Sequence, residues 1–110
     1  MSRILIRTKE KTFFVGLEDV LYCKAAGAYS IIYLVGDKEI VTSINLLKLQ
    51  ERMQCWTSIF RVSQSYLVNL LAVRSINHGK KELELENSNL IPFTVSVREI
   101  EKIFISIDLN

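Results

Sequence analysis

The stretch FRVSQSYLVNLLAVRSI, residues 60–76, holds two apolar segments on either side of a short polar one. Phe60–Val62 and Tyr66–Val68 are rich in β-branched and aromatic residues, which favour β-strands. The residues between them, Ser63–Ser65, are small, polar and uncharged. We expect the apolar segments to form two strands of a hairpin held by the core, with the polar tip left outside.

Outward from this stretch, short apolar segments alternate with turn signals, which is typical of an antiparallel β fold. Gly36 and Asp37 form a two-residue hairpin signal, and Pro92 marks the last strand as an edge strand. Further strands are predicted at Ile4–Arg7, Thr12–Val15, Val20–Ala25, Tyr29–Val35, Lys38–Thr42, Val73–Ile76, Lys81–Leu85 and Leu90–Phe93. The sequence therefore predicts a mainly β fold of small antiparallel sheets joined by hairpin loops.

Two segments have helical rather than strand periodicity. Ile44–Arg52 carries leucines at helical spacing, and Ser43 is available as its N-cap. Near the C-terminus, Ser96 and Glu99 match the S-x-x-E capping box, which marks the start of a helix. An apolar stripe that can pack against a sheet follows, formed by Val97, Ile100, Phe104 and Ile107, with Ile103 beside them. We expect one short internal helix and a C-terminal helix; Ile105 falls off the stripe, where it could face a partner chain or another domain.

The composition is that of a soluble globular protein. The chain has 110 residues, of which 49% are apolar and 24% charged, and we expect a single domain spanning residues 1–110 with one core. No apolar run approaches the roughly 18 residues of a membrane helix, and the charged N-terminus does not resemble a signal peptide. Cys23 and Cys55 are far apart and lack a CxxC partner, so neither a zinc site nor a disulfide framework is indicated. We expect a cytoplasmic protein in which Cys23 is a small buried hydrophobe.

The charge distribution is uneven although the net charge is only +2. Between Glu51 and Glu82 there is no acidic residue, while the same window contains Arg52, Arg61, Arg74, Lys80 and Lys81. Such a one-sided field could attract a polyanion, but chance clustering on a solvated face explains it equally well.

The sequence offers no constellation of catalytic residues. The only histidine, His78, lies in a predicted turn, and Ser65 has no base assigned to it by any motif. Glu82, Glu84 and Glu86 alternate with leucines, which is the pattern of a solvent face. We therefore expect no catalytic residue, no metal ligand and no cofactor.

Binding chemistry is better represented. Arg98 falls near the second position of its helix, where a cation opposes the helix dipole. It could simply be solvated, or an external phosphate or guanine edge could satisfy both the arginine and the free N–H groups of the first turn. The amide of Gln64 could pair with adenine, or it could hold a phosphate or a water molecule.

Three stretches together resemble a known family. They are LEDVLYCKAAGAYSIIYL (residues 17–34), INLLKLQERM (44–53), and the stretch quoted first followed by IPFTVSVREIEKI (91–103). In this order and spacing they resemble the LytTR-type DNA-binding domain, the output module of a class of bacterial response regulators. The phrase Ser65–Asn69 is the most specific part of the match, and the resemblance covers nearly the whole chain.

The resemblance implies an elongated, mostly β fold that binds double-stranded DNA through loops rather than a recognition helix. Such domains commonly bind paired direct repeats, which implies a dimer on DNA and a receiver or sensor domain that this chain lacks. The segments expected to face DNA are the loop Gly27–Ser30, the tip, and the start of the last helix. The candidate DNA-binding residues are Tyr29, Ser30, Arg61, Gln64, Ser65, Arg98 and Lys102. Arg98 matches a base-reading arginine, whereas Arg61 and Lys102 would meet phosphates.

This chain departs from the family pattern at the tip. Many members carry a basic or histidine-bearing tip, but Ser63 and Gln64 are neutral here. The difference leaves the target sequence open and predicts a shallower dependence of affinity on salt, because fewer phosphates are neutralised.

Other interpretations remain open at the level of sequence. Tyr29 could simply begin a strand, and Asn69 is expected to bond backbone at a strand end rather than to touch DNA. Trp56, Phe60 and Tyr66 are more typical of core residues than of a stacking platform. The chain could instead be a protein-interaction module that uses edge strands or the Ile105 face of the last helix, or it could bind single-stranded nucleic acid through aromatic residues.

Overall fold

The computed structural model describes residues 3–108 of the chain. Its strands are β1 (Arg3–Arg7), β2 (Thr12–Gly16), β3 (Val20–Ala26), β4 (Tyr29–Leu34), β5 (Lys38–Thr42), β6 (Ile59–Arg61), β7 (Tyr66–Asn69), β8 (Val73–Asn77), β9 (Glu82–Leu85) and β10 (Leu90–Pro92). Its helices are α1 (Leu46–Arg52) and α2 (Val97–Asp108), and short 3₁₀ turns lie at Leu17–Asp19 and Leu70–Ala72. The strands expected from the sequence are thus present with closely similar boundaries.

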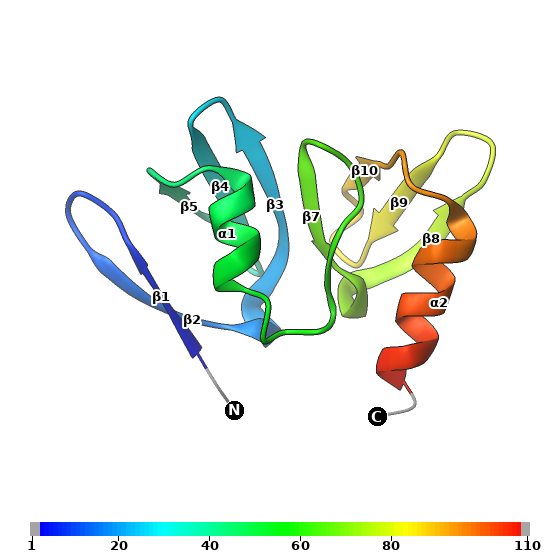
Figure 1. Cartoon of the computed structure of the whole chain (residues 1–110), viewed down its shortest axis with the longest axis horizontal. Coiled ribbons are helices and arrows are strands. Elements are labelled where there is room, and N and C mark those ends of the chain that lie inside the picture. The colour runs from blue at the N-terminus through cyan, green and yellow to red at the C-terminus, as the bar shows by residue number, and fades with distance from the viewer. Residues whose placement is uncertain (1–2, 109–110) are drawn as a thin grey trace.

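The described strands form three antiparallel sheets that follow one another along the long axis of the molecule (Figure 1). β1 pairs with β2, the central sheet has the order β5-β4-β3-β7-β6, and the last sheet has the order β10-β9-β8. The principal axes measure 41 × 30 × 25 Å. The predicted elongated arrangement of small antiparallel sheets, with one short internal helix and a C-terminal helix, is confirmed. Neither helix of the described chain is long and apolar enough to cross a membrane.

The stretch of residues 60–76 connects the central sheet to the last one. β6 and β7 form an antiparallel hairpin, with Phe60 opposite Val68 and Arg61 opposite Leu67, as expected. β7 also pairs with β3 on its other side, and the chain then passes through a 3₁₀ turn directly into β8. One continuous segment therefore holds the middle of the molecule together.

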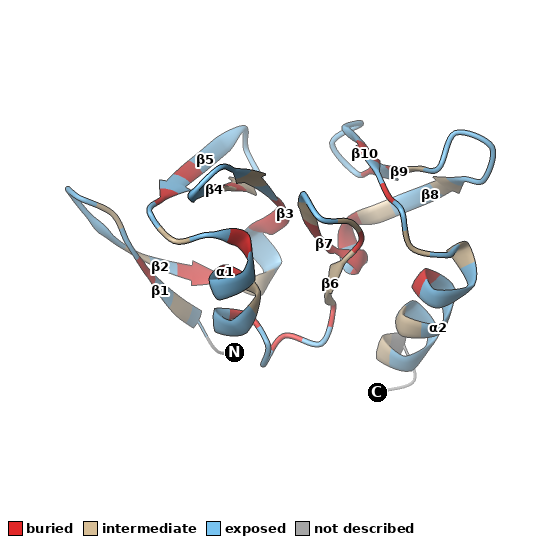
Figure 2. Ribbon diagram, turned by 45° about the horizontal axis from the view of Figure 1, so that its top comes forward, coloured by how far each residue is buried: buried red, intermediate tan, exposed pale blue. Residues whose placement is uncertain are grey.

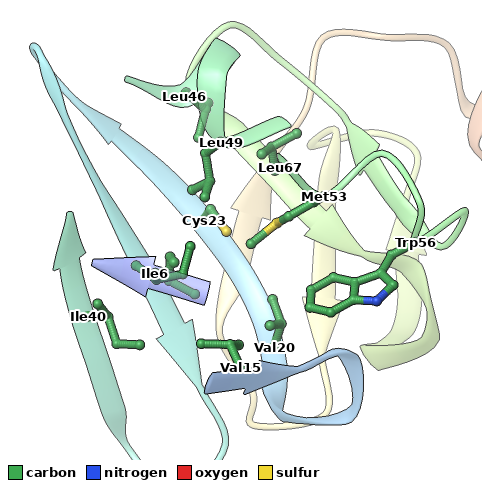
Figure 3. Packing of buried hydrophobic residues seen from close by; sticks show 11 residues of the cluster. Ile6, Val15, Val20, Cys23, Ile40, Leu46, Leu49, Met53, Trp56 and Leu67 are labelled. Atoms are coloured by element: carbon green, nitrogen blue, oxygen red, sulfur yellow. The ribbon is translucent and has the colours of Figure 1, made fainter. Parts of the chain in front are cut away.

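Two clusters of buried residues fill the fold, one on each face of the central sheet, where the length alone had suggested a single core. On β7, Leu67 belongs to the first cluster and Val68 to the second, because successive side chains of a strand point to opposite faces. The first cluster lies among the central sheet, α1 and the β1–β2 pair (Figure 3); its buried members are Ile6, Val15, Val20, Cys23, Ile32, Ile40, Leu46, Leu49, Met53, Trp56 and Leu67. The second lies against the last sheet and α2; its buried members are Leu21, Tyr22, Val62, Val68, Leu70, Ala72, Leu83, Leu85, Ile91, Phe93 and Ile100. Figure 2 shows buried positions on the strands and on both helices, with the loops around them largely exposed.

A β-bulge places two successive residues of β3 in the same cluster. The register with β4 shifts between Val20 and Tyr22, so Val20 and Cys23 enter the first cluster while Leu21 and Tyr22 enter the second. Cys23 is fully buried, as expected, and burial raises the pKa of its thiol because the thiolate would be desolvated. Cys55 is exposed.

The helix starts agree only in part with the sequence expectations. α1 begins at Leu46 with Asn45, not Ser43, as its N-cap, and Oδ1 of Asn45 accepts a hydrogen bond from the Lys48 N–H at 2.9 Å. Both residue types cap helices well, so sequence alone could not choose between them. For α2 the predicted cap is confirmed, because Oγ of Ser96 accepts a hydrogen bond from the Glu99 N–H at 3.1 Å.

The apolar stripe of α2 is only partly buried. Ile100 is buried and Val97, Ile103 and Ile107 pack against the second cluster, as expected. Phe104 is 41% exposed and lines a groove beside β8. Ile105, which lies off the stripe, is 56% exposed.

The buried side chain of Asn69 joins the end of β7 to the start of β3. Its Nδ2 donates hydrogen bonds to the carbonyl oxygens of Val20 at 2.9 Å and Leu17 at 3.3 Å. Its Oδ1 accepts a hydrogen bond from the Leu71 N–H at 3.1 Å. The expectation that Asn69 bonds backbone is confirmed, and every polar atom of this buried amide has a partner.

We predict that Asn69→Ala lowers the free energy of unfolding by about 1–3 kcal/mol, because it leaves buried backbone groups without partners. Thermal unfolding monitored by circular dichroism measures this loss. Gln54→Ala is the control, since Gln54 is exposed. Equal melting temperatures for the two variants would contradict the role given to Asn69.

Candidate nucleic-acid interface

The tip between β6 and β7 projects its side chains away from both cores. The Val62 N–H donates to the Tyr66 carbonyl oxygen at 3.1 Å, and the Ser65 N–H donates to Oγ of Ser63 at 3.2 Å, which closes the tip. Gln64 and Ser65 are exposed, and within the described chain the side-chain amide of Gln64 forms no hydrogen bond. The expectation of a polar tip outside the core is confirmed.

Backbone hydrogen bonds join the tip and Val62, the residue before it, to the other two candidate segments. The Ser65 carbonyl oxygen accepts a hydrogen bond from the Ala25 N–H at 2.8 Å, just before the turn between β3 and β4. The Val62 carbonyl oxygen accepts hydrogen bonds from Thr94 at 2.9 Å and Val95 at 3.4 Å, in the segment that leads into α2. The tip therefore lies between the β3–β4 turn and the entry to α2, and both links are main-chain bonds.

The β3–β4 turn presents one aromatic side chain. Ala26 pairs with Tyr29, so the turn itself is Gly27-Ala28, and Gly27 adopts a positive φ of 67° that suits glycine. The Tyr29 side chain is 55% exposed although it begins β4. In Figure 1 this turn and the β6–β7 tip both lie along the upper side of the molecule, opposite the end of α2.

The first turns of α2 present two cations. Arg98 and Lys102 are exposed and stand one helical turn apart, so they share a face of the helix. The Ser96 cap and the half-buried Val97 and Ile103 fix the orientation of this face. An anion near this end of the helix would interact favourably both with Arg98 and with the helix dipole.

Two of the candidate residues are engaged inside the protein. The Ser30 side chain is fully buried, and its hydroxyl donates to the Ile44 carbonyl oxygen at 2.8 Å, so the structure argues against Ser30 as a surface contact. Arg61 is half-buried and its guanidinium group bonds to the Ser63 and Gln64 carbonyl oxygens and to the side chain of Gln50. Sequence reasoning missed Gln50, because nothing in the spacing of α1 marks a half-buried glutamine as part of the site.

The cations of the acid-free window do not all project from one segment. Nη1 of Arg52 donates to the Leu5 carbonyl oxygen at 3.2 Å, on the β1–β2 side of the molecule. Arg74 lies on β8, and Lys81 stands over the Phe93 ring at 5.4 Å. The two candidate cations of α2, Arg98 and Lys102, lie outside this window.

The family model for the LytTr DNA-binding domain matches residues 10–105 of the chain. The chain therefore belongs to the LytTr DNA-binding domain family. Among solved structures it is similar to the LytTr DNA-binding domain of a putative methyl-accepting/DNA response regulator from Bacillus cereus. The two share 18% sequence identity and a TM-score of 0.67 over 96% of this chain and 95% of the other, a likeness that shows a common fold. A search of curated proteins gives no match.

Because the Ser30 hydroxyl is directed into the protein, we predict that Ser30→Ala lowers stability by about 1 kcal/mol and leaves intrinsic DNA affinity unchanged. Chemical denaturation measures the first effect, and titration of DNA well below the melting temperature measures the second. A large loss of affinity from a variant of unchanged stability would instead restore Ser30 as a DNA contact.

Proposed function

We propose that this domain binds double-stranded DNA in a sequence-specific manner through three joined segments. These are the β3–β4 turn, the β6–β7 tip and the first turns of α2. The observation that supports the proposal best is the set of main-chain hydrogen bonds from Ser65 to Ala25 and from Val62, just before the tip, to Thr94 and Val95. These bonds hold the two loops and the start of α2 in a fixed arrangement relative to one another. A surface that binds a duplex needs such a fixed arrangement.

Within this surface the side chains differ in the DNA chemistry that suits them. Arg98 can bond bidentately to a guanine edge in the major groove, and Lys102 is suited to a neighbouring phosphate. Gln64 can read an adenine edge or hold the register on the backbone, and Ser65 and Tyr29 offer hydroxyl groups to phosphates. Affinity then rests on few charges, so its salt dependence is shallow.

The Bacillus cereus domain is described as part of a response regulator. By analogy we propose that this chain acts as the output domain of a two-component transcriptional regulator, with a receiver or sensor domain as its input partner. Binding as a dimer to paired direct repeats follows from the same analogy.

One observation favours a second function, that of a protein-interaction module. A groove of about 380 Å³ lies between β8 and α2, and its lining includes the exposed side chains of Phe104 and Ile105. Exposed apolar surface of this kind is typical of a contact with another protein. The groove is compatible with DNA binding, because its lining includes Ile100 and Glu101 of α2 but none of the candidate DNA-binding residues.

Selection of bound duplexes from a random pool tests the proposed function. We expect enrichment of a motif that occurs twice at fixed spacing. Across a salt titration, the affinity for that duplex should exceed the affinity for single strands. Equal binding to all duplexes would contradict sequence specificity, and a preference for single strands would support the aromatic-platform alternative.

We predict that Arg98→Ala weakens binding to the selected duplex by about 1–3 kcal/mol and relaxes the preference at one base pair. Lys102→Ala is the matched variant: it should weaken all duplexes alike and reduce the slope of log affinity against log salt by about 1. Fluorescence anisotropy over a salt series measures both. An equal loss of affinity for all duplexes in Arg98→Ala would contradict a base-reading role for Arg98.

We predict that Gln64→Ala weakens binding to the selected duplex and leaves the melting temperature unchanged, because the Gln64 side chain bonds nothing in the described protein. If Gln64 reads a base, the preference at one position relaxes; if it only holds register, all sequences weaken together. Gln54→Ala serves as the control for losing an exposed glutamine. A clear drop in melting temperature would show that the Gln64 side chain is structural.

A further inference from the structure

We propose that Arg61 and Gln50 form a clasp that sets the backbone of the tip, Ser63–Ser65, and so positions Gln64 toward DNA. The inference rests on the proposed function, because Gln64 matters here as a candidate DNA contact. It makes Arg61, which the family resemblance suggests as a phosphate contact, a positioning residue. It also adds Gln50, on α1, to the residues on which recognition depends.

Three nitrogen atoms of Arg61 bond to three oxygen atoms of the protein. Nε donates to the Ser63 carbonyl oxygen at 2.8 Å, and Nη2 donates to the Gln64 carbonyl oxygen at 2.7 Å. Nη1 donates to Oε1 of Gln50 at 2.9 Å. A guanidinium group presents its donors in a rigid planar fork, which suits two successive carbonyl groups; a lysine ammonium group has no such fork.

The two clasped carbonyl groups belong to the peptide planes on either side of Gln64. Both lie beyond the hydrogen bond from Val62 to Tyr66, so the hairpin ladder does not hold them. Hydrogen bonds from a charged donor are about twice as strong as neutral ones, which makes Arg61 an effective substitute for the ladder. With both planes fixed, the direction in which the Gln64 side chain leaves the backbone is fixed as well.

Gln50 anchors this arrangement to the first cluster. It is half-buried on α1, a helix whose Leu46 and Leu49 are buried against the central sheet. Its amide oxygen holds the one terminal nitrogen of Arg61 that does not contact the tip. The tip is thereby tied to a helix that does not itself belong to the proposed DNA surface.

The same bonds oppose a phosphate-binding role for Arg61. To extend toward a phosphate, the guanidinium group would have to give up the carbonyl groups of the tip and the side chain of Gln50. Binding a phosphate would then remove the hydrogen bonds that hold the backbone of the tip. Positioning and direct charge contact therefore predict different consequences for substitutions, and these can be separated by experiment.

The first measurement is made without DNA, on the full chain. Amide hydrogen exchange by NMR at Ser65, and at Ala25 whose N–H bonds the Ser65 carbonyl, reports the order of the tip. We expect Gln50→Ala to speed exchange at both amides roughly tenfold, because fewer bonds oppose local opening. Gln54→Ala, an exposed position just beyond the end of α1, is the control, and because alanine favours helices Gln50→Ala should keep α1 folded. Unchanged exchange in Gln50→Ala would overturn the clasp.

The second measurement uses the selected duplex and a scrambled one. We expect Gln50→Ala and Arg61→Lys each to lower the affinity for the selected duplex about tenfold and the affinity for the scrambled one much less. The slope of log affinity against log salt should stay unchanged. If Arg61→Lys keeps full affinity while Arg61→Gln reduces the salt slope by about 1, Arg61 is a phosphate contact and the proposal is wrong.

The two readouts separate the clasp from the function on which it rests. If the wild-type domain prefers no duplex, the proposed function fails, and the exchange rates still decide whether Arg61 and Gln50 order the tip. If the domain prefers a duplex but Gln50→Ala changes neither exchange nor preference, the proposed function stands and the clasp is overturned.

Discussion

The buried amide of Asn69 fixes the point at which the chain leaves the central sheet, and the arrangement of everything after it depends on that point. Its bonds to the carbonyl groups of Leu17 and Val20 hold the end of β7 against the start of β3, and its bond to Leu71 shapes the turn into β8. The last sheet and α2 follow from there. A buried amide with all of its partners is rigid, whereas one without them would be costly, so the junction has a single stable geometry.

From this junction the proposed interface acquires its shape through main-chain bonds. The carbonyl groups of Ser65 in the tip and of Val62 just before it bond the two neighbouring segments, and the side chains that would meet DNA take no part in these bonds. The domain thus separates the groups that build the surface from the groups that would contact a duplex. The small number of exposed cations on that surface fits a protein that depends on shape and on a few polar contacts more than on phosphate attraction.

The sequence predicts the strands and hairpins well, because alternation and turn residues are local signals. It predicts the Ser96 cap for the same reason, but it cannot choose between Ser43 and Asn45, which are both good N-caps. The sequence does not predict the hydrogen bonds of the Ser30 and Arg61 side chains. Their partners, Ile44 and Gln50, come near them only in the folded chain. The fold has two clusters of buried residues rather than one core because the central sheet is covered on both faces. Composition alone does not reveal that coverage.

The freedom of the Gln64 side chain has a consequence for how such a domain changes over time. Its two flanking peptide planes are held by Arg61, so its own side chain contributes nothing to the frame that displays it. A different residue at this position would be displayed in the same direction on the same scaffold. If the domain binds DNA as proposed, a change in its DNA site can be matched by a single substitution at this position, with no second substitution needed to keep the fold.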